Sequence, residues 1–315
     1  MSQGPVPAPH PSPHPVSPGE FRCSQESAAQ EEPMLGTAST VQSWLLLEHP
    51  GPWGRYALPD SRLPDGLGDE LRIRAAASGV RVLLIRRPGR SAEGSTGAFA
   101  IRSGPEEPWI ERVALAGFEA ALELDLDRLG RGERPGAGIP HEGPVFLVCT
   151  HGRHDPCCAE RGRPVAEALS SAFPDETWES SHFGGDRFAG NLVVFPHGFY
   201  FGRVRPEESE AVVRTYLDGL LDLERLRGRS CRPMPVQAAE HFLREQEGLD
   251  RIDDVEPEDA TTTPSGARVR FRTGAGGFEV HLAREPDLVA RRLTCHSQHE
   301  ERPPTYRLLA IEPLA

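Results

Sequence analysis

The chain has 315 residues and a mass of 34.5 kDa, long enough to bury a large core without disulfide or metal staples. Its formal net charge is −12 and its pI about 5.5, which argues against the cationic face that generic nucleic-acid binding requires. No stretch approaches the roughly 20 apolar residues of a membrane-spanning helix, and no basic, then apolar, secretory signal opens the chain. We therefore expect a cytoplasmic protein that binds neither nucleic acid nor membrane.

Residues 1–20 alternate proline with small residues and histidine, a composition typical of a disordered tail. Order is expected to begin near Phe21 and to form an amino-terminal α/β region over residues 21–138. There, an apolar run, a helical pattern and a second apolar run predict a strand, a helix and a parallel strand. The predicted elements are strands at 44–48, 80–85, 97–102 and 109–115 and a helix at 66–78.

Residues 139–230 follow a Gly/Pro-rich linker and form the second predicted region. Its patterns give the order strand, helix, strand, hairpin, helix, which is the thioredoxin-type order. The predicted elements are strands at 144–148, 177–180, 192–195 and 200–204 and helices at 158–172 and 206–223.

Residues 231–315 are predicted to form a small α+β appendage. The elements expected in it are a helix at 236–246 and strands at 267–272, 278–283 and 306–311. Cys231 and Cys295 are isolated in the sequence. The alternatives for Cys295-His296-Ser297-Gln298-His299 are a partial metal site and a surface loop, and we expect the surface loop. The acidic segment 253–259 is assigned no secondary structure.

Three of the six cysteines, Cys149, Cys157 and Cys158, lie within ten residues directly after a predicted strand. In a reducing compartment, clustered cysteines indicate metal binding or redox activity rather than structural disulfides. His182 follows the next predicted strand and completes a mixed sulfur and nitrogen donor set that suits zinc or an iron-sulfur cluster. Common structural zinc sites space their cysteines by two to four residues, whereas eight residues separate Cys149 from Cys158. That wider spacing favours a two-iron cluster.

Adjacent cysteines point in different directions along an ordinary backbone, so only one of Cys157 and Cys158 is expected to share a metal with Cys149. His182 and Asp186 bracket two glycines, whose missing side chains allow the backbone to fold tightly over a bulky ligand. The alternative for this segment is a glycine turn in which the histidine and the aspartate simply form hydrogen bonds.

Five motifs follow one another along the chain. They are Gly36-Thr37-Ala38, the segment 44–54, Cys-Thr-His-Gly-Arg-His-Asp-Pro-Cys-Cys-Ala at 149–159, His-Phe-Gly-Gly-Asp-Arg-Phe-Ala-Gly-Asn at 182–191 and Pro-His-Gly-Phe-Tyr-Phe-Gly-Arg-Val at 196–204. Together these motifs resemble the sucrase/ferredoxin-like family. The resemblance covers roughly residues 21–226 and implies a thioredoxin-like ferredoxin domain. The fold class expected is therefore α/β, a thioredoxin-like ferredoxin domain with an α/β amino-terminal half and a small α+β carboxy-terminal appendage.

The resemblance also implies a cofactor, because relatives hold a [2Fe-2S] cluster with two cysteines and a His-x-x-x-His pair. Carried over, Cys149 and Cys158 match the cysteines and His182 the first histidine. The fourth position is Asp186, a departure from the pattern. Asp186 itself, Cys157 or a nearby histidine are the alternatives for the fourth ligand, and a chain without a cluster is another.

The function that this implies is one-electron transfer between a reductase and an acceptor protein, neither of which the sequence identifies. An electron carrier of this kind is not itself a catalyst. The alternative is a thioredoxin-type thiol redox enzyme using Cys157 or Cys158, although no Cys-x-x-Cys motif occurs in the chain. Sucrose hydrolysis, suggested only by the family's name, would require two facing carboxylates, and no glycosidase motif is present.

Overall fold

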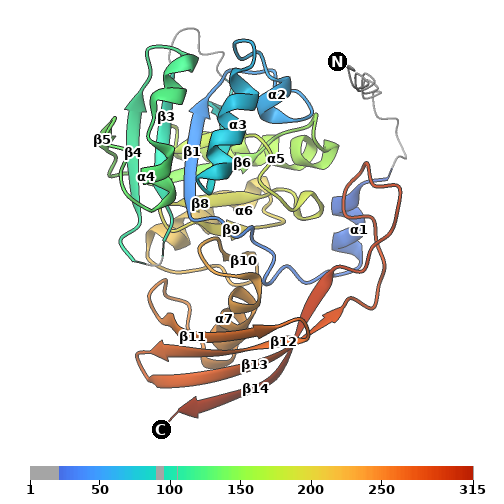
Figure 1. Cartoon of the computed structure of the whole chain (residues 1–315). Helices are drawn as coiled ribbons and strands as arrows, with labels where there is room; N and C mark the ends of the chain where they lie inside the picture. Colours follow the sequence, from blue (N-terminus) through green and yellow to red (C-terminus); the bar gives the residue numbers. More distant parts are fainter. Residues whose placement is uncertain (1–20, 90–95, 105, 315) are drawn as a thin grey trace, which may run out of the picture.

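The computed structural model describes residues 21–89, 96–104 and 106–314, so the predicted disordered tail at 1–20 lies outside the described residues. A ten-stranded mixed sheet runs through the larger part of the molecule, and a four-stranded antiparallel sheet lies at its carboxy-terminal end (Figure 1). The predicted mixed α/β class is confirmed. No described helix is both long enough and apolar enough to cross a membrane.

The amino-terminal half contributes one end of the large sheet, in the strand order β2-β1-β3-β4-β5. β1 and β2 are parallel and joined through α3, β3 pairs antiparallel with β1, and β4 pairs antiparallel with β3. The elements are α1 (Cys23–Ala29), β1 (Ser43–Glu48), α2 (Ala57–Asp60), α3 (Leu67–Ala77), β2 (Val80–Arg86), β3 (Gly97–Arg102), β4 (Trp109–Ala114), η1 (Phe118–Glu123), α4 (Leu126–Gly130) and β5 (Ile139–Pro140).

The second half has the predicted thioredoxin-type arrangement, with the strand order β10-β9-β8-β6-β7. β6 and β7 are parallel and joined through α5, and β8 and β9 form the expected antiparallel hairpin. The elements are β6 (Val145–Cys149), α5 (Pro156–Ala172), β7 (Thr177–Ser180), η2 (Asp186–Phe188), β8 (Leu192–Phe195), β9 (Phe199–Phe201), α6 (Pro206–Leu217) and β10 (Leu226–Arg229).

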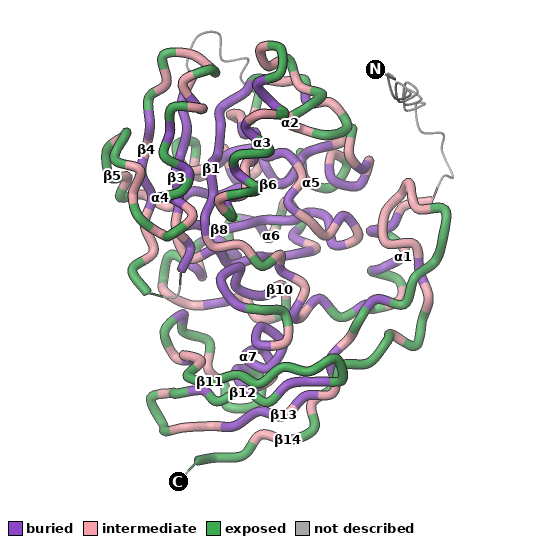
Figure 2. Tube along the Cα trace, in the orientation of Figure 1, coloured by how far each residue is buried: buried purple, intermediate pink, exposed green. Residues whose placement is uncertain are grey.

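The two halves therefore repeat one topology, with β1, β2, β3 and β4 corresponding to β6, β7, β8 and β9. They meet where β2 pairs antiparallel with β7, through Ile85 with Ser180 and Arg86 with Glu179. Every residue of β1 and β6 is buried, which explains their apolar runs (Figure 2). The four residues of β7 are buried too, although only Trp178 among them is apolar. This junction brings the loop after β1 next to the loop after β6.

The appendage packs α7 against one face of the four-stranded sheet, burying Leu243, Val269, Phe271 and Val280 in a core of its own. The helix and three strands agree with the sequence-based elements. Three strands were not predicted: the two-residue β5 in the predicted linker, β10 just after the predicted helix 206–223, and β11, whose residues are mostly exposed and lack an apolar pattern. The elements are α7 (Met234–Glu247), β11 (Val255–Thr263), β12 (Gly266–Thr273), β13 (Gly276–Pro286) and β14 (Pro304–Leu314).

Candidate metal centre

Cys149 is the last residue of β6, and the loop that follows it leads directly into α5. Asp155 caps this helix, because its Oδ1 accepts a hydrogen bond from the Cys157 amide at 2.9 Å. α5 also packs unusually close to β6. A Cβ atom added to Gly162 would lie 2.0 Å from the Cys149 carbonyl oxygen, so only glycine permits this approach. The close packing brings Cys158, in the first turn of α5, back to Cys149.

Cys149, Cys158 and His182 form one group, in which a ligand atom from each lies within 4.8 Å of the others. Cys149 and Cys158 are buried, and His182 reaches them from the loop after β7. The structure thus brings together the three residues that the sequence singled out first, from two neighbouring strand ends and a helix amino terminus.

Asp186 lies beside this group at the start of η2 and is 4% exposed. Its Oδ1 accepts a hydrogen bond from the Cys158 thiol at 3.0 Å and lies 2.9 Å from His182 Nδ1. The His154 ring stacks on His182 with centroids 3.8 Å apart, and its Nε2 is 3.8 Å from Asp186 Oδ2. Asp186 and His154 are therefore the two further side chains that adjoin the three donors.

The protonation of the group is set by mutual contacts that outweigh burial. Contact with the Cys158 thiol, aided by His182, lowers the pKa of Cys149 to about 6 in spite of its burial. Burial lowers the pKa of His182, but the contacts with Asp186 and Cys149 outweigh it and raise the pKa to about 10. For Asp186, burial raises the pKa, but the contact with His182 outweighs burial and holds the pKa below its ordinary value. The mutual contacts therefore favour the ionised forms of Cys149 and Asp186.

Two glycines, Gly184 and Gly185, set the backbone of the loop from His182 to Asp186, and the buried Arg227 binds this loop through hydrogen bonds. Gly184 and Gly185 have φ of 112° and 85°, which side chains other than glycine rarely adopt. The Arg227 guanidinium donates to the Gly184 carbonyl at 3.1 Å and to Asn191 Oδ1 at 2.8 Å, and Asn191 donates to the Gly185 carbonyl at 2.7 Å. Burial lowers the pKa of Arg227 to about 10.

Arg227 also explains part of the Gly36-Thr37-Ala38 motif. Its Nε donates to Thr37 Oγ1 at 3.1 Å and its Nη2 to the Thr37 carbonyl at 2.7 Å, so the motif anchors the arginine under the loop. Sequence reasoning missed Arg227. Arg227 is one of several arginines at alternate positions around β10, so no local pattern distinguishes it, and its contact with Thr37 joins residues 190 positions apart.

His151 connects the site to the amino-terminal half of the sheet. Its Nε2 lies 2.6 Å from the Gly54 carbonyl and must donate to it, so Nδ1 is free to accept from the His182 amide at 3.2 Å. Burial lowers the pKa of His151 to about 4, which keeps this neutral tautomer. Both ring nitrogens are thereby used, and the segment 49–54 after β1 covers the loop after β6.

A pocket of about 610 Å³ opens beside the group. His151, His154 and His182 line it together with three arginines and Asp69 of the amino-terminal half, so His182 borders a pocket with an excess of basic side chains. These arginines are Arg55, Arg72 and Arg81.

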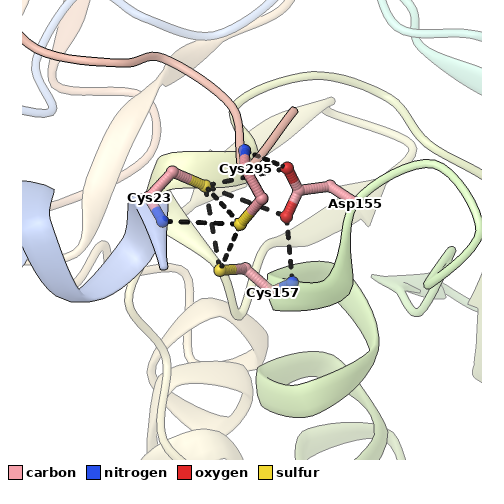
Figure 3. A group of neighbouring side chains, drawn as sticks. All are labelled: Cys23, Asp155, Cys157 and Cys295. Carbon is pink, nitrogen blue, oxygen red and sulfur yellow. Dashed lines mark hydrogen bonds between the residues drawn. The ribbon is translucent and has the colours of Figure 1, made fainter. Parts of the chain in front are cut away.

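Cys157, the predicted substitute for the fourth ligand, does not lie in this group. Its side chain leaves α5 on the other side from Cys158 and meets Cys23 and Cys295 in a second group, together with Asp155 (Figure 3). The expectation that Cys295 is isolated is wrong. Cys231 is buried, and none of the metal-binding groups among the described residues includes it.

The first group fits a thiolate- and imidazole-bound metal centre. Cys149 and Cys158 provide soft donors, and His182 Nδ1 is buried without a well-aligned hydrogen-bond partner among the described residues, as expected of a nitrogen that a metal would take. Its neighbour Asp186 adds an oxygen donor at ion-pair distance.

The sucrase/ferredoxin-like family model matches residues 34–228, more than half of the chain and the whole of this site. The chain belongs to the sucrase/ferredoxin-like family. It is also similar to solved structures of a thioredoxin-like [2Fe-2S] ferredoxin from Aquifex aeolicus. One has 19% identity and a TM-score of 0.26, covering 30% of this chain and 97% of the ferredoxin. A cysteine-to-serine variant has 22% identity and a TM-score of 0.24, with 27% and 97% covered. No protein of curated function matches this chain.

Membership of the sucrase/ferredoxin-like family accounts for the motifs at both ends of the site. The matched segment begins just before the Thr37 anchor and ends just after Arg227, so it spans the donors and the contacts that position them. Cys23 and Cys295 lie outside it.

Proposed function

We propose that the protein is an electron carrier that holds a [2Fe-2S] cluster through Cys149, Cys158, His182 and Asp186. The observation that carries the proposal is the grouping of two buried thiols and one imidazole within 4.8 Å at the end of β6, in a member of the sucrase/ferredoxin-like family. A bound [2Fe-2S] cluster would accept and release one electron. Two cysteine ligands and a histidine would leave less negative charge at the centre than four thiolates.

The surrounding residues suit this role. Asp186 is the fourth ligand in the proposal because its carboxylate contacts both Cys158 and His182, whereas His154 lies further out and is partly exposed. His151 holds the backbone of His182 in place, and Arg227 supports the loop with a fixed positive charge. The arginines around the pocket would favour an acidic partner beside His182, which lines the same pocket.

The alternative of a thiol redox enzyme using Cys157 or Cys158 has less support. Both thiols are buried at 0% exposure, so a substrate disulfide has no approach to either sulfur.

Purification under anaerobic conditions, followed by iron and sulfide analysis and electron paramagnetic resonance of the reduced protein, tests the proposal. Two iron and two sulfide per chain, lost in Cys149→Ala and His182→Ala, are the expected result. Cys231→Ala is the matched control, because it removes a buried thiol that is remote from the group. A folded protein that remains free of iron after reconstitution with iron and sulfide would refute the proposal.

A further inference from the structure

The second group of thiols lies outside the proposed cluster and joins three distant parts of the chain. Cys23 lies in α1, Cys157 at the start of α5 and Cys295 in the segment between β13 and β14 (Figure 3). The Sγ atoms are 3.7 Å apart for Cys23 and Cys157, 3.4 Å for Cys157 and Cys295, and 3.6 Å for Cys23 and Cys295. All three are free cysteines.

These separations are those of ligands on one tetrahedral ion. With zinc-sulfur bonds of about 2.3 Å, a tetrahedron places its sulfur atoms about 3.8 Å apart. A disulfide would need its two sulfurs about 2.05 Å apart. Thiolates bound to different irons of a cluster lie much further apart, because the irons and their bridging sulfides stand between them. The triangle of sulfurs therefore fits a single metal ion better than a disulfide or a cluster.

Asp155 occupies the position of a fourth donor. Both of its carboxylate oxygens lie 3.8 Å from Cys23 Sγ, and the side chain is fully buried. Two backbone amides orient it, since Oδ1 accepts from Cys157 N at 2.9 Å and Oδ2 from Cys295 N at 2.7 Å. The carboxylate thus lies next to the sulfur atoms. Each of its oxygens accepts one amide hydrogen bond and has a second lone pair that could bind a metal.

The surroundings of the group would favour a bound cation. Cys23 and Cys157 pack with Ala189 and Phe21, so the three thiols and the carboxylate share an apolar pocket. Burying a carboxylate among thiols carries a large desolvation cost unless a positive charge is bound. The amino terminus of α5 and its amides offset only a part of this charge.

We propose that Cys23, Cys157, Cys295 and Asp155 form a structural zinc site, separate from the [2Fe-2S] centre. Three thiolates and one carboxylate are a donor set that zinc accepts in tetrahedral geometry, and all four positions would be filled by protein, as in structural sites. Binding would release the thiol protons and leave no coordination position for a substrate.

The site would act as a clasp for the two ends of the chain. Cys23 and Cys295 are 272 positions apart, and in Figure 1 α1 lies beside the segment that links β13 to β14. Zinc would fasten both to the start of α5, the helix turn that also carries Cys158. The clasp therefore holds the appendage against the ferredoxin-like part next to the proposed cluster.

Zinc analysis and zinc-edge X-ray absorption on the full-length wild-type protein test the site without any substitution. The expected result is one zinc per chain, with three sulfur ligands at about 2.3 Å and one oxygen at about 2.0 to 2.2 Å. The protein is expressed in medium that contains zinc. The proposal would be overturned if the purified protein holds no zinc, or if its zinc is bound by nitrogen and oxygen ligands alone. A Cys157–Cys295 disulfide in protein purified under reducing conditions would also overturn it.

Substitutions then separate this proposal from the proposed function. Cys295→Ala should lower the zinc affinity by more than about 100-fold, since even the loss of an outer-shell partner costs about 10- to 100-fold. It should leave iron and sulfide in place, whereas Cys149→Ala should lose iron and retain zinc. Cys231→Ala is the control for removing a buried thiol and should retain both metals. If zinc persists in folded Cys295→Ala and Cys157→Ala proteins, the zinc site is refuted and the cluster proposal is untouched.

Discussion

Cys157 and Cys158 are consecutive residues in the first turn of α5, yet their sulfur atoms serve two different groups. The Cys158 thiol donates to Asp186 Oδ1 at 3.0 Å, while the Cys157 sulfur lies 3.4 Å from that of Cys295. A helix turns each residue by about 100°, so neighbouring side chains diverge. One helix terminus therefore connects the proposed cluster to the proposed zinc clasp.

The first prediction concerns the fourth ligand. Asp186→Ala should lower the iron content of the purified protein at least about tenfold, because the loss of a ligand costs more than the loss of an outer-shell contact. Asp186→His, which restores His-x-x-x-His, should retain the cluster and change its electron paramagnetic resonance spectrum. His154→Ala should retain iron and the wild-type spectrum. Loss of iron in His154→Ala with retention in Asp186→Ala would instead assign the ligand to His154.

The second prediction concerns Arg227, whose positive charge acts on Asp186 and Cys149. Arg227→Met should lower the reduction potential, because removing a nearby cation disfavours the added electron. It should also destabilise the fold by roughly 3 kcal/mol or more, since four hydrogen bonds to oxygens of Thr37, Gly184 and Asn191 are lost.

Arg227→Lys is the control, because it preserves the charge but lacks the planar fork of donors. Its potential should stay near that of the wild type while its denaturation midpoint falls. Equal potentials in the Met and Lys variants, measured by protein-film voltammetry, would show that the charge of Arg227 does not act on the centre.

The third prediction concerns the packing of α5 on β6. Gly162→Ala should destabilise the protein by about 1 to 3 kcal/mol and lower cluster occupancy, because its Cβ would meet the Cys149 carbonyl oxygen. Helix propensity alone would predict a stabilisation of up to about 1 kcal/mol, so the sign of the effect is informative. Gly274→Ala, where nothing lies within 4 Å of the new Cβ, is the matched control and should be near neutral in urea denaturation.

The fourth prediction concerns His197, whose Nδ1 lies 2.7 Å from the Tyr216 hydroxyl. Burial, aided by Arg229, lowers the pKa of His197 from 6.5 to about 4, with Asp253 opposing. The unfolded chain therefore binds the proton more readily. The contribution of neutral His197 to the free energy of unfolding is complete above pH 6.5 and is lost as the pH falls towards 4.

His197→Gln removes this titration. Between these pH values, the free energy of unfolding should fall more steeply for the wild type than for the variant, by about 2 kcal/mol in total. Urea denaturation at a series of pH values measures the difference. Parallel curves for the two proteins would show that His197 is protonated equally in both states.

The sequence by itself determined the local features of this protein. Continuous apolar runs marked β1 and β6 because these strands are buried on both faces, and the Cys149 motif stood out because it directly follows such a run. β11 was not predicted because its residues are mostly exposed and pairing with β12, rather than an apolar face, holds them in a strand.

Only the tertiary structure decided which residues meet. The contacts of Cys23 with Cys295 and of Thr37 with Arg227 span 272 and 190 positions, and no local pattern encodes the packing that closes such distances. The same packing assigned Cys158 and Cys157 to different groups. This assignment depends on how closely α5 approaches β6 at Gly162. It also depends on the packing of Cys23 and Cys295 against the start of α5.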